Sequence, residues 1–270
     1  MWNYGYDTSP FKEYEIRKAA IEDGITSIGD YAFEGCSGLT ELTLPNSVTS
    51  IGWSAFEDCI GLTELTLPNS ITSIGACAFW YCTGMTELTL PSSVTSIGNS
   101  AFFGCSGLTK LTLPNSLESI GEHAFCDCSG LTELTLPNSL ESIGEEAFAY
   151  CSGLTELTLP NSITSIGYSA FCGCSGLTEL TLPNSVKSIG DIAFRGCSGL
   201  VKITSLAKIP PVCDPEVFDG VNKTNCELIV PEGSVAAYTR AEDWNKFSNI
   251  RGFSGVEVTV AGKTRKIVVE

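Results

Sequence analysis

The chain has little of what most enzymes and nucleic-acid-binding proteins need. There is one histidine among 270 residues, which leaves almost no material for histidine-based catalysis or histidine metal sites. The 15 lysines and arginines are outnumbered by 31 aspartates and glutamates, and the net charge of −16 argues against nucleic acid or an anionic membrane surface as partner. No apolar run approaches the ~18 residues of a membrane-spanning helix. The start shows no basic segment followed by an apolar stretch, so no signal peptide is visible.

What the sequence has instead is an internal repeat of 23 residues. One unit reads LTELTLPNSVTSIGWSAFEDCIG at 39–61, full units run from 39 to 199, and 16–38 is a degenerate first unit. A unit this short cannot bury its own apolar face. Stacking solves this, because the same position on neighbouring units then forms a continuous core. We call one turn of such a stack a rung, and one repeated position a column.

The pattern inside a unit predicts its local structure. Leu42 and Leu44 alternate with Glu41 and Thr43, which indicates a short strand with its leucines inward. Pro45 ends the strand because proline cannot donate to a sheet. The piece AFEDC predicts a helical turn on the opposite side. One strand per unit gives a parallel sheet with rungs about 4.8 Å apart, and roughly ten rungs give a solenoid on the order of 50 Å long.

Both ends of a solenoid need caps, because an open rung exposes apolar surface and a sheet edge. The aromatic-rich segment 1–15 is expected to be the N-terminal cap, before the eight repeats of 16–199. Residues 200–251 are expected to form divergent rungs and a C-terminal cap with an amphipathic helix at 235–247. The alternation in 252–270 predicts a terminal β-hairpin.

The strand-proline start, the I-G pair, the A-F pair and the closing cysteine of each unit resemble the BspA-type leucine-rich repeat proteins, over about 16–199. Residues 203–250 resemble that family's C-terminal cap, and the start resembles the end of a preceding segment, as in a fragment of a longer protein. The resemblance implies a leucine-rich-repeat-like solenoid with a short parallel β-strand per rung. It also implies a secreted or cell-surface protein of host-associated bacteria or protists, engaged in adhesion or host-protein binding.

Eight cysteines form one column, and they could bind metal, form disulfides or stay reduced in the core. Stacked side chains in register do not favour the ~90° disulfide torsion, and free cysteine packs as a small hydrophobe, so we expect a buried, reduced column. Cys126 and Cys172 lie beside this column and are expected to be exposed. Whether Cys213 and Cys226 are bonded stays open. No cofactor or metal is expected.

Two sets of surface residues are candidates for ligand binding. The first is a strand column of carboxylates, interrupted by Lys110 and ended by Lys202: Glu41, Glu64, Glu87, Glu133, Glu156 and Glu179. Lys110 is expected to pair with both of its neighbours in the row. Stacked like charges repel, and a cation or basic partner would relieve this. The simpler interpretation is that duplication copied one solubilising glutamate.

The second set is aromatic. The positions after the I-G and A-F pairs vary between otherwise near-identical units, and they include Trp53, Trp80, Tyr81 and Phe103. Together these could form one exposed patch of the kind that contacts proteins or sugars. Drift at unconstrained positions is an equally good explanation.

These observations favour a non-catalytic extracellular binding or adhesion module that presents a rigid repeat surface to a host or matrix protein. A glycosidase would need one acid and one base in different environments inside a cleft, whereas these glutamates are equivalent and lie on an open face. The alternatives are a carbohydrate-binding module and a structural spacer in a larger surface protein with further domains.

Overall fold

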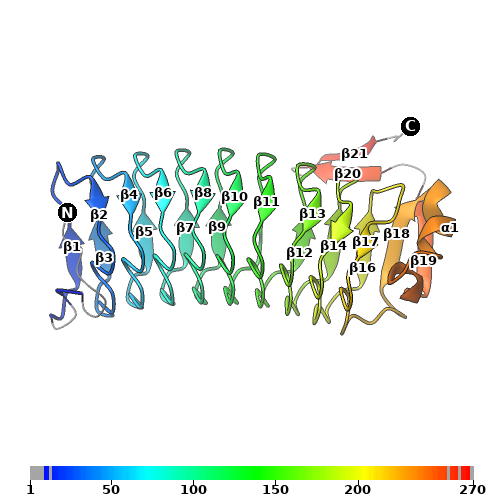
Figure 1. The fold of residues 1–270 in the computed structure, drawn as a ribbon, viewed down its shortest axis with the longest axis horizontal. Helices are drawn as coiled ribbons and strands as arrows, with labels where there is room; N and C mark the ends of the chain where they lie inside the picture. Colours follow the sequence, from blue (N-terminus) through cyan, green and yellow to red (C-terminus); the bar gives the residue numbers. More distant parts are fainter. Residues whose placement is uncertain (1–8, 12–13, 254–255, 261–262, 268–270) are drawn as a thin grey trace.

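A computed structural model describes residues 9–11, 14–253, 256–260 and 263–267. The chain winds into a straight parallel β-solenoid of about ten rungs, which confirms the predicted fold class (Figure 1). Most rungs carry two short strands rather than the single strand expected from the sequence. The added strand is the Ser-Ile pair that comes directly before the glycine repeated in each unit, such as Gly52. The strands therefore form two parallel rows along the solenoid (Figure 1).

The first row holds the Glu-Leu-Thr segments. Its strands are β1 (Lys18–Ala20), β3 (Glu41–Thr43), β5 (Glu64–Thr66), β7 (Glu87–Thr89), β9 (Lys110–Thr112), β12 (Glu156–Thr158), β14 (Glu179–Leu182), β16 (Lys202–Ser205), β18 (Glu227–Pro231) and β19 (Asn249–Phe253). Single bridges at Glu133 join β9 to β12 across the rung between them. Where neighbouring strands pair, each residue lies opposite its equivalent on the next rung, as Leu88 does with Leu111.

The second row holds the Ser-Ile segments. Its strands are β2 (Ser27–Ile28), β4 (Ser50–Ile51), β6 (Ser73–Ile74), β8 (Ser96–Ile97), β10 (Ser119–Ile120), β11 (Ser142–Ile143), β13 (Ser165–Ile166), β15 (Ser188–Ile189) and β17 (Val212–Cys213). The glycine after each Ser-Ile pair lies against the glycine of the preceding rung. A Cβ on Gly75 would come within 2.7 Å of the carbonyl carbon of Gly52, so a side chain there has no room.

The AFEDC piece of each unit forms consecutive turns rather than helix. The amide of Cys59 donates to the carbonyl of Phe56 at 3.2 Å, but the amide of Phe56 donates to Ala78 of the next rung at 2.8 Å. Left-handed backbone at Ser54 (φ 50°) and Asp58 (φ 57°) prevents a helix from continuing. This side of the solenoid is therefore held by bonds between rungs, as a sheet is.

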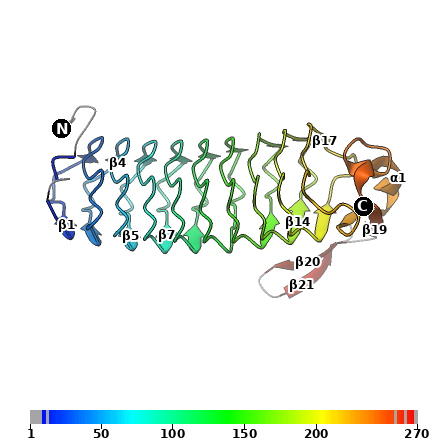
Figure 2. The same cartoon turned by 90° about the horizontal axis from the view of Figure 1, so that it is seen from below.

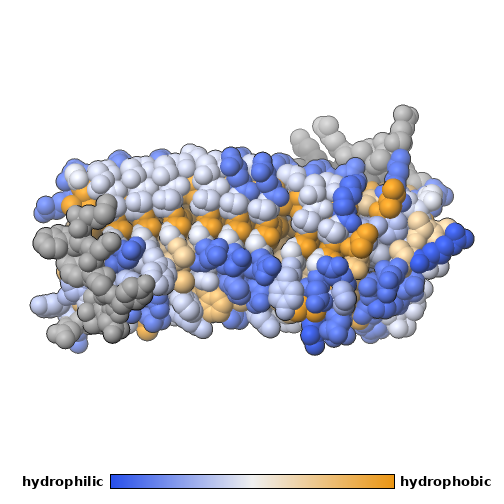
Figure 3. All heavy atoms as spheres, viewed as in Figure 1, coloured by the Kyte–Doolittle hydropathy of each residue, from blue (hydrophilic) through white to orange (hydrophobic). Residues whose placement is uncertain are grey.

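The core is built from columns of identical side chains. The phenylalanines of successive rungs stack with ring centroids 5.2–5.8 Å apart and interplanar angles of 1–8°, from Phe33 to Phe218. Phe11 extends the stack at the N-terminal end, 5.2 Å from Phe33. Of the expected N-terminal cap at 1–15, residues 1–8 and 12–13 lie outside the described residues. In Figure 3, an apolar stripe runs along the array between two hydrophilic bands.

The cysteine column is buried and reduced. From Cys59 to Cys197 each thiol donates a hydrogen bond to the carbonyl of the phenylalanine on the preceding rung, at 3.1–3.3 Å. All 13 cysteines of the chain are free, including Cys213 and Cys226. Burial raises the pKa of the Cys105 thiol to about 12 and holds that of Cys128 well above its ordinary value. These two thiols are therefore neutral at physiological pH.

The C-terminal cap differs from the helix expected at 235–247. That segment contains only a four-residue helix α1 (Val235–Tyr238), preceded by the 3-10 turn η1 (Glu232–Ser234) and followed by a second one, η2 (Trp244–Lys246). The helical conformation is interrupted before η2, where Asp243 has left-handed backbone (φ 64°). In a continuous helix, residues six apart lie on different faces, so Tyr238 and Trp244 could not both point inward. The break allows both to be fully buried.

The last strands are β20 (Val256–Val260) and β21 (Lys263–Ile267), which pair antiparallel with Val258 opposite Arg265. Figure 2 shows this pair to one side of the array near its C-terminal end. Residues 254–255, 261–262 and 268–270 of the expected hairpin lie outside the described residues. In the part of the chain that the structure describes, no helix is long and apolar enough to cross a membrane.

Candidate functional site

The glutamate row lies on the exposed face of the first strand row, which we call the sheet face. Glu64 is in register with Glu87, and Glu156 with Glu179, while their leucine neighbours point into the core. Of the six, only Glu179 is half-buried and the others are exposed. A depression of about 490 Å³ on this face is lined by Lys18, Glu41 and Glu64, among others.

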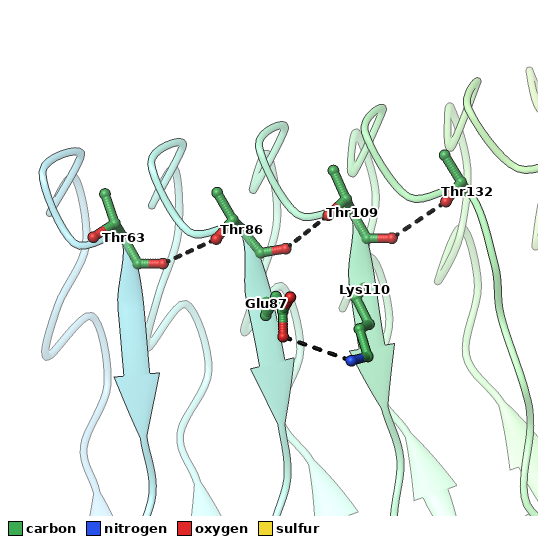
Figure 4. A network of polar contacts seen from close by, with 6 residues as sticks. All are labelled: Thr63, Thr86, Glu87, Thr109, Lys110 and Thr132. Carbon is green, nitrogen blue, oxygen red and sulfur yellow. Dashed lines mark hydrogen bonds and ion pairs between the residues drawn. The ribbon is translucent and has the colours of Figure 1, made fainter.

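Three lysines divide the row into two blocks of three glutamates. Lys18, Lys110 and Lys202 stand four rungs apart in the same column, and sequence reasoning missed the role of Lys18. They form ion pairs with Glu41 (2.5 Å), Glu87 (3.7 Å) and Glu179 (2.9 Å), respectively. Lys110 was expected to pair also with Glu133, but among the described residues its ion pair is with Glu87 alone (Figure 4).

A threonine column borders the glutamates and ties the rungs together. The hydroxyl of Thr86 donates to the carbonyl of Thr63 at 3.4 Å, and that of Thr109 donates to Thr86 at 3.1 Å (Figure 4). The same bond recurs at Thr132, Thr155 and Thr178. The hydroxyls of this column are used within the protein, whereas the glutamates and the second exposed threonine column of the strands, such as Thr66 and Thr89, face outward.

The aromatic candidates lie beside the phenylalanine stack, on what we call the variable side. Trp80, Tyr81 and Phe103 contact one another, with ring centroids 5.6–6.0 Å apart. Trp53 contacts Tyr31 of the preceding rung at 5.1 Å. Trp53 and Tyr81 are 41 % and 43 % exposed, whereas Trp80 and Phe103 are half-buried. The exposed part of the three-ring cluster is therefore chiefly Tyr81.

Two further tyrosines are as exposed as the predicted candidates. Tyr150 and Tyr168 are 50 % and 42 % exposed, and both occupy variable columns. Sequence reasoning read these columns but missed the two residues, because it sought aromatics on adjacent rungs. The signal was present in the column that contains Tyr81, where tyrosine returns three rungs later at Tyr150.

Cys126 and Cys172 were expected to be exposed thiols, and this was wrong. They are 2 % and 9 % exposed and form a small apolar cluster with Ala149, against which Phe103 packs. Burial raises the pKa of Cys126 to about 12. The reason is that Ala149 lies between the two thiols in this column and that Phe103 of the preceding rung packs against them.

Among the described residues, no group of three or more histidine, cysteine, aspartate or glutamate side chains could hold a metal ion. The profile described as "BspA type Leucine rich repeat region (6 copies)" matches residues 7–131 and 95–223, which is most of the chain.

The chain belongs to the BspA-type leucine-rich repeat family.

Solved structures of leucine-rich repeat proteins resemble this BspA-type chain. One from Bacteroides ovatus is 28 % identical with a TM-score of 0.56, over 87 % of this chain and 72 % of that one. One from Eubacterium ventriosum is 20 % identical (TM-score 0.54, 93 % and 77 % covered). The pneumococcal vaccine antigen PcpA is 23 % identical (TM-score 0.53, 88 % and 68 % covered). The last two likenesses concern the fold alone. No curated protein matches the sequence.

Proposed function

We propose that this BspA-type protein is a non-catalytic binding module that presents a rigid repeat surface to a protein ligand, as in adhesion to a host or matrix protein. The observation that carries the proposal is the contrast between interior and surface. Every rung has the same buried columns, while the variable side bears the contacting rings of Trp80, Tyr81 and Phe103. Exposed aromatic clusters on rigid scaffolds are typical of protein contacts.

The sheet face supports the same proposal. Glu64, Glu133 and Glu156 have no ion-pair partner among the described residues, and the segment 16–199 holds 19 acidic against 5 basic residues, a net −14. Such a field attracts basic partners and accelerates their association. The equivalent, solvated environments of these glutamates offer no distinct acid and base, which argues against hydrolysis.

Family membership supports a secreted or cell-surface location for the chain, in a bacterium that interacts with a host. A second candidate function, carbohydrate binding, is favoured by one observation. The rings of Trp53 and Tyr81 are 41 % and 43 % exposed, and an exposed aromatic ring can stack on a sugar face.

The test is capture of purified extracellular-matrix and plasma proteins, and of a glycan panel, on the immobilised protein by biolayer interferometry. Trp53→Ala with Trp80→Ala removes aromatics from the variable side, and Glu64→Gln with Glu156→Gln removes two unpaired negative charges from the sheet face. Tyr168→Ala is the matched control, an exposed aromatic outside the three-ring cluster. Circular dichroism melts confirm that each variant folds.

The proposal expects a protein ligand whose capture falls at least about tenfold in one of the two double variants and is unchanged in the control. Capture of glycans alone would favour the carbohydrate function. Binding to neither panel would favour a spacer and contradict the proposal.

A further inference from the structure

One column of the variable side has a period of three rungs. It reads Gly35, Asp58, Tyr81, then Gly104, Asp127, Tyr150, then Gly173 and Gly196. All eight residues have left-handed backbone, with φ between 54° and 73°. Glycine and aspartate are ordinary occupants of this conformation, whereas tyrosine is not.

Each tyrosine in this column lies across the glycine of the next rung. A Cβ on Gly104 would come within 2.7 Å of two ring carbons of Tyr81, and a Cβ on Gly173 within 2.5 and 2.8 Å of two ring carbons of Tyr150. The glycine supports one side of the ring, and about half of each tyrosine remains exposed. Both rings are therefore held in place from below, and Tyr81 is also flanked by the rings of Trp80 and Phe103.

Each of the two tyrosines has a carboxylate on the preceding rung. The amide of Asp58 donates to the carbonyl of Trp80 at 2.8 Å, and that of Asp127 to Ala149 at 2.9 Å, which sets each aspartate one rung before a tyrosine. Both aspartates are exposed. The pKa of Tyr150 is raised, chiefly by Cys172 and by burial, with further contributions from Glu146, Cys126 and Asp127. An aromatic face beside a carboxylate is the environment that suits a guanidinium or ammonium group.

The spacing of the two tyrosines indicates the form of the ligand. Phenylalanine rings on the same rungs are 5.2–5.4 Å apart, so three rungs separate Tyr81 from Tyr150 by about 16 Å. In an extended peptide, side chains four residues apart point the same way and stand about 13 Å apart, a difference that flexible arginine side chains can span. Side chains five residues apart point in opposite directions.

We propose that Asp58 with Tyr81 and Asp127 with Tyr150 form two docking points for basic side chains, which bind an extended segment of the partner protein with arginines four residues apart. The segment lies along the solenoid, and the net −14 of the array attracts it. This inference rests on the proposed function and names the chemistry of its ligand.

The test uses fluorescein-labelled synthetic peptides and fluorescence anisotropy at physiological salt. One peptide carries two arginines four residues apart in a serine-threonine background, a second carries them five apart, and a third replaces both with neutral citrulline. The first should bind at least about tenfold more tightly than the second, because both docking points are engaged only with the first. The citrulline peptide should not bind.

Tyr81→Asn and Tyr150→Asn remove the rings while asparagine tolerates the left-handed backbone. Each substitution should lower the affinity for the first peptide by about tenfold or more. The two substitutions together should lower that affinity to the affinity for the second peptide or below. Asp58→Asn with Asp127→Asn leaves both rings in place and should also weaken binding. Tyr168→Asn, an exposed tyrosine in another column, should have no effect.

Equal affinity for the two arginine spacings, or unchanged binding in both double variants, would overturn the inference. A matrix or plasma protein that is still captured in that case would leave the proposed function standing. If the unmodified protein captured no matrix or plasma protein, the proposed function itself would be rejected.

Discussion

The array and the C-terminal cap solve the same problem of burial in different ways. In the array, each buried residue contacts its own equivalent on the rungs before and after, as in the phenylalanine stack. In the cap, burial depends on single contacts. The indole of Trp244 donates to the carbonyl of Pro211 at 2.8 Å, and the hydroxyl of Tyr238 donates to that of Ala207 at 2.9 Å. The array is therefore uniform, whereas the cap buries its residues through these individual contacts, which do not repeat from rung to rung.

The largest effect should come from high pH, which acts on those thiols of the cysteine column whose pKa burial raises: Cys59, Cys82, Cys105, Cys128 and Cys151. The folded protein holds thiols such as Cys105 and Cys128 neutral, with pKa values raised above 9 by burial. The contribution of these thiols should be constant from neutral pH to about pH 8 and fall above it, because the unfolded chain then releases protons that the folded chain retains. Each thiol costs on the order of 1 kcal/mol per pH unit, so these thiols together cost several. Thermal melts from pH 7 to 11 measure this, and a flat profile would contradict it.

Removing one large buried side chain should show whether the two regions unfold separately. Trp244→Ala and Phe125→Ala should each lower the free energy of unfolding by about 3–5 kcal/mol in denaturant titrations. Hydrogen exchange should locate the loss near the C-terminal rungs for Trp244→Ala and on both sides of the fifth repeat for Phe125→Ala, because rungs interact only with their neighbours. Uniform loss of protection in both variants would mean that array and cap are one cooperative unit.

A thiol of the column should matter more than a thiol outside it. Cys105→Ala removes the bond to the Phe79 carbonyl and leaves a small void, so the free energy of unfolding should fall by about 1–2 kcal/mol. Cys77→Ala, at a half-buried position, should change it by about 0.5 kcal/mol or less. Similar losses for both would show that burial in the column carries no special stability.

The smallest effect is a gain. Ile192, at the last rung before the cap, has left-handed backbone (φ 52°), which a β-branched residue adopts at a cost. Ile192→Asn should raise the free energy of unfolding by about 1 kcal/mol. Ile209→Asn is the control, since Ile209 is 82 % exposed without left-handed backbone and its replacement should give no gain.

The fold was predictable from the sequence because one period placed equivalent residues in columns. The inward leucines, the stacked Phe56 and Phe79 and the reduced thiols all follow from a repeat that must bury the same side chain on every rung. The cap was less predictable. Its helix is broken because Trp244 has to meet the carbonyl of Pro211, a contact between segments that no local pattern relates.

The surface was predictable in composition and less so in grouping. The glutamate row follows from the period, but its pairing with Lys18 requires knowing that the degenerate first unit continues the same column. The buried state of Cys126 depends on Ala149 of the next rung, so it cannot be read from one unit. The equivalence of Tyr81 and Tyr150 appears only when a column is followed over three rungs.

The contact between Gly52 and Gly75 has a consequence for how such a protein can change in length. Backbone touches backbone there, so the loss or gain of one residue would misalign every later column. Removing or adding a full 23 residues recreates the same contacts on either side of the joint. Evolution can therefore adjust the reach of the molecule in fixed increments while leaving both of its ends untouched.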